Sequence, residues 1–235
     1  MMLNELKKAL RNSINPEKAA FFPRFFKTGP GEYGEGDRFL GVTVPDQRLV
    51  AKKFKDLPLS DLKKLLESKW HEERLTALII MVNQFKKADE IKQKELYKFY
   101  LEHTKRINNW DLVDTSARDI VGGYIFKHQE LLPTLDRLAE SDLLWERRIA
   151  IIATYYFLMQ GEPDVTVKIA TKLLKDTEDL MHKAVGWMLR EMGKRCDRQL
   201  LVEFLEAHAH EMPRTMLRYA IEHFDKTIRV QFLDR

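Results

Sequence analysis

The sequence feature that most constrains the fold is a helix-start pattern that recurs along the chain. Similar segments begin with a large or charged residue and continue with apolar and small ones, as in W-H-E-E-R-L-T-A-L-I-I, W-E-R-R-I-A-I-I-A and M-H-K-A-V-G-W-M-L-R. Such segments begin at or near Trp70, Trp110, Trp145, Met181 and Glu211. Intervals of roughly 30 to 40 residues are typical of HEAT-like helical hairpins. We therefore predict an all-α solenoid in which one helix of each pair lines a concave face.

Apolar periodicity inside these segments also indicates helices. Leu75, Leu78, Ile79 and Val82 follow the i, i+3, i+4, i+7 spacing of one helix face. Capping, proline and acidic residues at 15–17, 60–61 and 162–164 are typical helix starts. No convincing alternating strand pattern is present in the sequence, so we expect helices almost throughout.

One long glycine-rich stretch interrupts the helical pattern. Residues 28–43 hold five of the ten glycines. We predict a single HEAT-like repeat domain over residues 1–235, with N-terminal helices in 1–27, a loop at 28–43 and helical repeats in 44–235. A loop of this length inside a compact domain tends to be functional or mobile.

Composition narrows the class of protein. The chain has 235 residues, of which 44% are apolar, and 40 basic against 36 acidic side chains give a net charge of +4. That charge favours nucleic acid only weakly. The single Cys196 excludes an internal disulfide and a zinc site built from cysteines. No apolar segment is typical of a signal peptide or a membrane span, so we expect a cytoplasmic protein. We also expect a monomer.

Three short segments carry the residues that are best suited to catalysis or ligand binding. They are N-N-W-D-L-V-D at 108–114, W-E-R-R at 145–148 and G-W-M-L-R-E at 186–191. Asp114 follows Trp110 by one helical turn, so both side chains share a helix face. Trp110 and Trp187 can lay their rings against a cation. Arg148 and Arg190 suit bidentate contacts with phosphate.

Together with F-L-G-V-T-V-P-D-Q-R at 39–48, these segments resemble the AlkD-type alkylpurine DNA glycosylases over nearly the whole chain. In that family the elements W-x-x-x-D, W-x-x-R and G-W-x-L-R-E build the active cleft. They fall here on Trp110 with Asp114, Trp145 with Arg148, and Trp187 with Arg190. One departure is that Phe25 and Phe26 stand where a family tyrosine is expected.

The resemblance implies a right-handed superhelix whose concave face binds double-stranded DNA. It also implies hydrolysis of the N-glycosidic bond of cationic N3- or N7-alkylated purines, with no metal or cofactor. Asp114, Trp110 and Trp187 are the expected catalytic residues, and Arg148 and Arg190 the expected DNA contacts. This chemistry suits the residues, because an alkylated purine leaves as a neutral base and needs no general acid. An anionic group is then best placed to stabilise the sugar cation.

Thr43 and Arg48 flank the proline of V-T-V-P-D-Q-R and complete the expected DNA contacts. A helix that starts near Pro45 presents amide groups to a phosphate, although simple capping explains the same residues equally well.

Other interpretations of the same residues stay open. Asp114 could pair with Arg118 four residues later, the tryptophans could be core residues, and each arginine could form an ion pair between repeats. At the level of the whole protein, the alternatives are a DNA-binding paralogue without catalysis and a protein-binding scaffold. The retained acid of the W-x-x-x-D segment argues against the first. Clustered basic side chains on the concave face would argue against the second.

Overall fold

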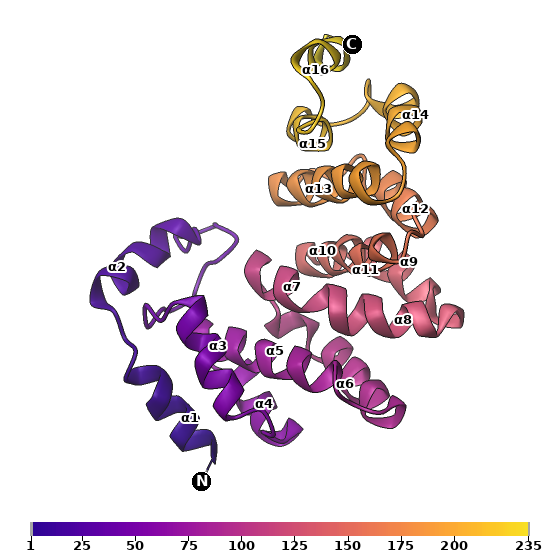
Figure 1. Ribbon diagram of the computed structural model, residues 1–235. Coiled ribbons are helices and arrows are strands. Elements are labelled where there is room, and N and C mark those ends of the chain that lie inside the picture. The colour runs from indigo at the N-terminus through magenta and orange to yellow at the C-terminus, as the bar shows by residue number, and fades with distance from the viewer. Residues whose placement is uncertain (1, 235) are drawn as a thin grey trace. The chain divides into compact units, whose positions relative to one another are not determined.

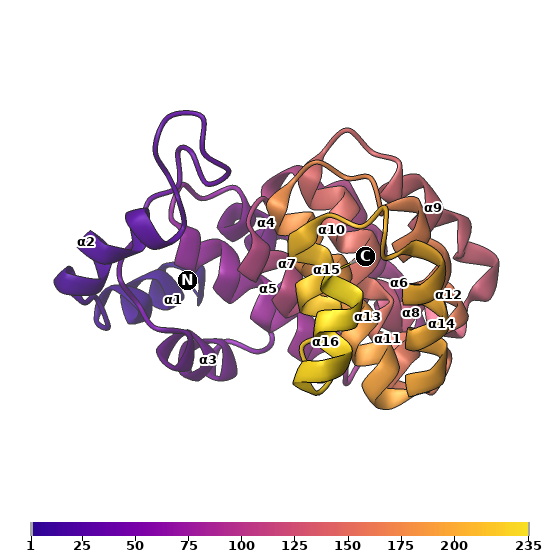
Figure 2. The same cartoon turned by 90° about the horizontal axis from the view of Figure 1, so that it is seen from above.

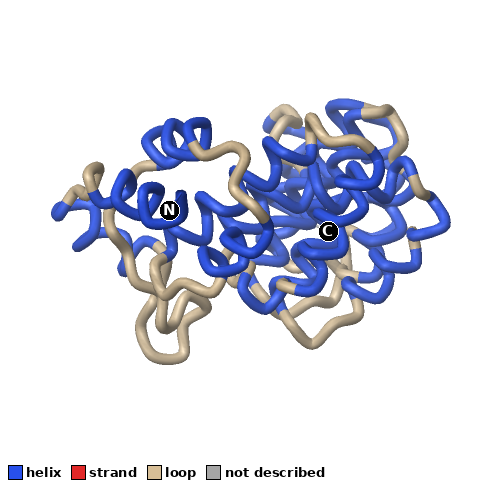
Figure 3. Tube along the Cα trace, turned by 90° about the horizontal axis from the view of Figure 1, so that it is seen from below, coloured by secondary structure: helices blue, strands red, loops and turns tan. Residues whose placement is uncertain are grey.

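The computed structural model describes residues 2–234, and its regular structure is helical throughout that range (Figure 3). The one β-type contact among these residues is an isolated bridge between Arg38 and Trp70. The chain divides after Ser116 into two compact units. The prediction of an all-α fold is therefore confirmed.

The first unit comprises helices α1 (Met2–Arg11), α2 (Pro16–Phe25), α3 (Val44–Lys53), α4 (Leu59–Leu66), α5 (His71–Phe85), α6 (Glu90–Glu102) and almost all of α7 (Trp110–Ala117). The second comprises α8 (Gly123–Lys127), α9 (Pro133–Ala139), α10 (Leu144–Ala153), α11 (Tyr155–Met159), α12 (Asp164–Lys172), α13 (Asp179–Arg195), α14 (Arg198–His208), α15 (Arg214–Ala220) and α16 (Lys226–Leu233). Short 3₁₀ turns lie at Thr104–Arg106 and Gln129–Leu131, and a π-helical turn at Arg118–Gly122 follows α7. The predicted starts at 15–17 and 162–164 agree with α2 and α12.

Helix α5 forms the core of the first unit. It packs against α3, α4 and α6 (Figure 1), so every residue from His71 to Val82 is buried, not only the predicted apolar stripe. Burial of a helix on all sides is normally confined to wholly apolar helices. Here the first turn is polar, and its side chains find partners inside the protein.

The glycine-rich stretch between α2 and α3 is a projecting loop, drawn in violet in Figure 2. Its last turn is fixed by the buried carboxylate of Glu72, which accepts backbone N–H groups from Leu40 at 3.0 Å and Gly41 at 2.8 Å. Gly41 has φ of +78°, and a Cβ atom there would lie 2.1 Å from the Asn15 carbonyl oxygen. Only glycine fits this position, because any side chain would collide with the backbone before α2.

The second unit stacks its helices in two rows. Helices α10, α13 and α15 follow one another in one row, and α9, α12 and α14 form the other (Figure 1). Gly186 lets α13 and α15 approach closely, because a Cβ atom there would lie 2.4 Å from the Met216 carbonyl oxygen. This layering of antiparallel pairs is the arrangement expected of HEAT-like hairpins.

No helix within residues 2–234 is both long enough and apolar enough to cross a membrane. The same residues contain no cluster of three or more histidine, cysteine, aspartate or glutamate side chains arranged to hold a metal ion.

Candidate functional site

Helix α7 carries the first pair of predicted site residues. Trp110 is its first residue and Asp114 lies one turn later, and both side chains are half-buried. The Asn109 side chain accepts the Trp110 backbone N–H at 2.8 Å, which fixes the start of the helix. Because the two residues lie one helical turn apart, their side chains leave the same face of α7.

An aromatic cluster extends from Trp110 to α2. Phe26 stacks on the Trp110 ring at 5.5 Å, and Phe25 meets the same ring edge-on at 6.0 Å. Phe26 is buried, but Phe25 is 50% exposed, and its ring contacts the ring of Phe21, which is 56% exposed. Exposed neighbouring aromatic rings of this kind form a surface on which a planar group can stack. The phenylalanines that replace the expected tyrosine therefore belong to the same cluster as Trp110.

A buried polar network lies behind this cluster. The His71 ring bonds Asp37 through Nδ1 at 2.9 Å and Asp111 through Nε2 at 2.8 Å. Arg74 donates to Asp37 at 2.6 Å, and the Asn109 amide donates to Asp37 at 3.3 Å. The network thus joins the glycine-rich loop, the start of α5 and the start of α7.

The charges of the network follow from its geometry. Burial alone would lower the pKa of His71, but the Asp111 and Asp37 carboxylates outweigh it and raise this pKa to about 9. Burial acts to raise the pKa of Asp37, yet the hydrogen bond from His71 and the charge of Arg74 leave it lowered. The His71 imidazole is therefore protonated at neutral pH, and the lowered pKa of Asp37 keeps that carboxylate charged. The ring lies within 4.9 Å of Phe26 and Phe39, which exclude water from it.

Thr43 and Arg48 lie at the start of α3. Thr43 is the N-cap residue, and its hydroxyl oxygen accepts the Asp46 backbone N–H at 3.4 Å, so it caps the helix as the alternative interpretation expected. The same hydroxyl donates to the Asp46 carboxylate at 2.5 Å. Arg48 is exposed on the first turns of the helix. Contacts of either residue with DNA stay a prediction.

Arg148 lies in the interior of the second unit. It is 5% exposed, and its Nη1 donates to the Leu180 carbonyl oxygen at 2.5 Å. The guanidinium therefore ties α10 to the first turn of α13. Its predicted phosphate contact is untested and would require this side chain to become exposed. Trp145, one turn earlier on α10, is half-buried.

Trp187 and Arg190 share α13 with a second cluster of rings and cations. Trp187 lies 6.0 Å from the Tyr155 ring, and the Arg195 guanidinium lies 4.9 Å above that ring. The Tyr155 hydroxyl accepts a hydrogen bond from Arg195, which also pairs with Glu191 at 2.8 Å. Arg190 is half-buried and forms an ion pair with Glu222. The predicted residues thus divide between the units, with Trp110, Asp114, Thr43 and Arg48 in the first and Arg148, Trp187 and Arg190 in the second.

The most highly organised residues of the first unit were not predicted from the sequence. Asp37, His71 and Asp111 come from segments 34 and 40 residues apart, so no local spacing connects them. One signal was available in H-E-E-R at 71–74, four polar residues that begin an otherwise apolar helix. Such a run is costly to bury unless each side chain is paired. Tyr155 in the second unit was missed for the same reason.

The sequence pattern of one protein family, described as DNA alkylation repair enzyme, matches residues 6–224 of the chain. The chain belongs to this family. In this DNA alkylation repair family member, the match covers both α7 with Trp110 and Asp114 and α13 with Trp187 and Arg190. No significant match was found among curated proteins.

Solved structures share the fold of this DNA alkylation repair family member. A predicted DNA alkylation repair enzyme from Enterococcus faecalis has a TM-score of 0.70 at 19% identity, covering 91% of this chain and 98% of its own. The smu.31 protein of Streptococcus mutans UA159 has a TM-score of 0.57 at 18% identity, covering 77% of this chain and 93% of its own. AlkD2 from Streptococcus mutans has a TM-score of 0.57 at 16% identity, covering 89% of this chain and 98% of its own. At these identities the likeness concerns the fold.

Proposed function

We propose that the protein is a DNA glycosylase that hydrolyses the N-glycosidic bond of cationic N3- or N7-alkylated purines in duplex DNA. The observation that carries this proposal is the placement of Asp114 one turn after Trp110, whose ring contacts the exposed ring of Phe25. An anion and open aromatic faces suit a positively charged sugar and base. Membership in the DNA alkylation repair enzyme family supports the choice of substrate.

The reaction needs little acid–base chemistry. The bond between the anomeric carbon and the base nitrogen breaks, and its electron pair neutralises the positive charge of the alkylated purine. The sugar is left as an oxocarbenium-like cation, which the Asp114 carboxylate stabilises electrostatically. Water then adds to the anomeric carbon and loses a proton, so the products are a free neutral base and an abasic site.

The second unit contributes DNA contacts in this proposal. Trp187 offers a further aromatic face, and Arg190 offers a guanidinium to a phosphate once its exposed partner Glu222 is displaced. Arg148 holds α13 in position through its hydrogen bond to Leu180. Because Arg148 is buried, a phosphate can reach it less easily than it can reach Arg190.

The deciding experiment is release of free base from duplex DNA alkylated with a methylating agent, measured with purified protein in the presence of a chelator. We expect release of 3-methyladenine and 7-methylguanine. If the duplex is bound and no base is released, the protein is a non-catalytic DNA-binding paralogue. If the duplex is not bound either, a protein-binding scaffold becomes the favoured interpretation.

A further inference from the structure

Helix α2 of the first unit leaves aromatic side chains open to solvent. It lies at the outer edge of this unit (Figure 1), and none of its ten residues is buried, although three of them are phenylalanines. Phe21 and Phe25 are 56% and 50% exposed, and their rings lie 5.9 Å apart with an angle of 30° between their planes. A single exposed apolar residue needs no explanation. Two neighbouring exposed rings instead form a continuous face on which a planar group can stack.

Free cations flank these two rings. Lys18 precedes Phe21 by one helical turn and Arg24 follows it by one turn, so the rings lie between the two cations on the helix surface. Both basic side chains are exposed, and neither has an ion-pair partner among residues 2–234. Glu17 is the single acid of the helix. Aromatic faces for bases and cations for phosphates are the combination by which proteins bind single-stranded nucleic acid.

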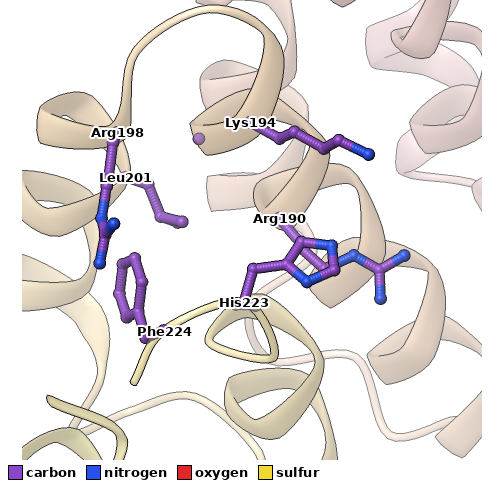
Figure 4. A pocket seen from close by; sticks show the side chains of 8 residues that line it. Arg190, Lys194, Arg198, Leu201, His223 and Phe224 are labelled. Atoms are coloured by element: carbon purple, nitrogen blue, oxygen red, sulfur yellow. The ribbon is translucent and has the colours of Figure 1, made fainter.

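A similar pairing of ring and cation in the second unit lacks this accessibility. Arg198 lies 4.7 Å above the Phe224 ring at a pocket among α13, α14 and α15 (Figure 4). Phe224 is only 8% exposed and contacts Phe232, and Arg190 at the same pocket is paired with Glu222. That pocket therefore offers a base no open ring face, whereas the rings and cations of α2 are all accessible.

The aromatic surface of α2 adjoins the proposed lesion site within the first unit. The Phe25 ring meets the Trp110 ring edge-on at 6.0 Å, and Asp114 follows Trp110 by one turn of α7. Phe21 extends the same surface by one further turn of α2. A base stacked on Phe21 would thus be a second base, distinct from the alkylated purine.

We propose that helix α2 binds an unpaired nucleotide of the DNA, with its base stacked on Phe21 and Phe25 and the adjoining phosphates on Lys18 and Arg24. Both faces of a base inside an intact duplex are covered by its neighbours, so only an unpaired base can stack on a protein ring. The proposal rests on the proposed function for the choice of DNA, but it does not require hydrolysis of any bond. The protein should therefore prefer a duplex that contains an unpaired base.

The first test compares a duplex carrying one unpaired thymine with the same duplex fully paired. The wild-type protein should bind the first about fivefold more tightly or better, which is the range for stacking one base. Phe21→Leu should lose this preference, whereas Phe21→Tyr, which keeps the aromatic ring, should retain it. Ile91→Ala shortens an exposed apolar side chain on α6 and is the control.

Because Phe21 is exposed, its variants should keep the wild-type melting temperature. A wild-type protein without the preference would overturn the proposal. A preference that survives in Phe21→Leu, or that is lost equally in Ile91→Ala, would do the same.

NMR of the phenylalanine rings provides a direct second test. Single-stranded octathymidylate should move the Phe21 ring signals, which are identified by their loss in Phe21→Leu, upfield through the ring current of the stacked base. Arg24→Gln should flatten the slope of log affinity against log salt by about 0.7 for this probe. Lys94→Gln removes a charge from an exposed site on α6 and should leave the slope unchanged. Unmoved Phe21 signals at saturation, or equal slopes in the two variants, would overturn the proposal.

A third arm tests a lipid surface, which exposed phenylalanines beside cations can also bind. Phosphatidylserine vesicles that compete with octathymidylate for the Phe21 ring and bind more tightly would overturn the proposal. Base release from alkylated duplex, assayed in parallel, tests the proposed function separately. Release without a preference for the unpaired thymine removes only the role of α2, and the preference without release removes only the glycosylase.

Discussion

Arg148 and Arg190 differ in burial, and this difference limits the partners that each guanidinium can bind. Arg148 is 5% exposed and donates a hydrogen bond to a backbone carbonyl oxygen, whereas Arg190 forms an ion pair with an exposed glutamate. A surface ion pair is exchanged readily for a phosphate, because it contributes little free energy. A buried guanidinium cannot be exchanged without exposing its acceptor. The two arginines should therefore differ in the property that is lost when each is replaced.

Arg148→Ala should lower the free energy of unfolding by about 1–3 kcal/mol, because the Leu180 carbonyl loses a buried charged donor. Arg190→Ala should leave stability nearly unchanged and should flatten the slope of log affinity against log salt by about one unit for duplex DNA. Urea denaturation and binding titrations at several salt concentrations measure the two effects. A salt-independent duplex affinity of the wild-type protein would contradict the phosphate contact.

Asp114 acts on charge that appears only as the bond breaks. Asp114→Asn keeps the size of the side chain and removes its charge, so excision of 7-methylguanine should slow by about 10²–10³-fold. Affinity for the duplex should change far less, since an anion does not attract DNA. Single-turnover kinetics and binding titrations measure the two quantities. Asp56→Asn, an exposed acid in the first unit, is the matched control, and full activity of Asp114→Asn would refute the role.

At the scale of elements, the first turn of α5 determines how the first unit is assembled. Glu72 holds the end of the glycine-rich loop, Glu73 pairs with Lys7 at 2.9 Å and with Arg11 at 3.0 Å on α1, and His71 joins the loop to α7. Each bond connects the helix to a different segment. The aromatic cluster around Trp110 therefore depends on the ionisation of His71, although this ring is itself buried.

The stability of the protein should fall as pH rises from about 6.5 to 9. His71 has its pKa raised to about 9 in the folded state, so the protonated ring stabilises the fold fully below its ordinary pKa of 6.5. This contribution, at most roughly 3 kcal/mol, is lost as pH rises through the folded-state pKa. Urea denaturation at each pH measures it. Asp37, Asp111 and Arg74 face the ring, and the lowered pKa of Asp37 keeps its carboxylate charged across this range.

His71→Gln provides the control for this pH dependence. Glutamine retains hydrogen-bonding groups and has no titrating charge, so the variant should be less stable than the wild type at pH 6. Its decline in stability between pH 6.5 and 9 should be much smaller. An equally steep decline in the variant would assign the pH dependence to another group.

At the level of the whole protein, each unit holds residues that are proposed to contact DNA. The first holds Trp110, Asp114 and the exposed Phe25, and the second holds Trp187. An anion and several aromatic rings recognise positive charge, and the proposed mechanism supplies no acid to protonate a leaving base. The whole protein should therefore select its substrates by a charge that the lesion already carries.

Duplexes that contain 3-methyladenine or 7-methylguanine should lose these bases, whereas uracil, hypoxanthine and 1,N6-ethenoadenine should stay in place. Trp110→Ala and Trp187→Ala should each slow excision of both methylpurines and create no activity on the neutral bases. Chromatography of the released bases, with chelator present, measures the whole panel. Efficient release of uracil or hypoxanthine would mean that a general acid takes part in the reaction. Activity abolished by the chelator would contradict the metal-free mechanism.

The helices and much of their grouping could be predicted from the amino-acid sequence. Periodic apolar residues and capping signals act within a few turns, so starts such as Pro16 and Asp164 could be predicted locally. The motif residues Trp110 and Asp114 share a helix for the same reason. The His71 network and the burial of Arg148 could be recognised only in the folded structure. Each of these depends on side chains far apart in the chain, and desolvation and pairing at such sites are fixed only when the helices pack.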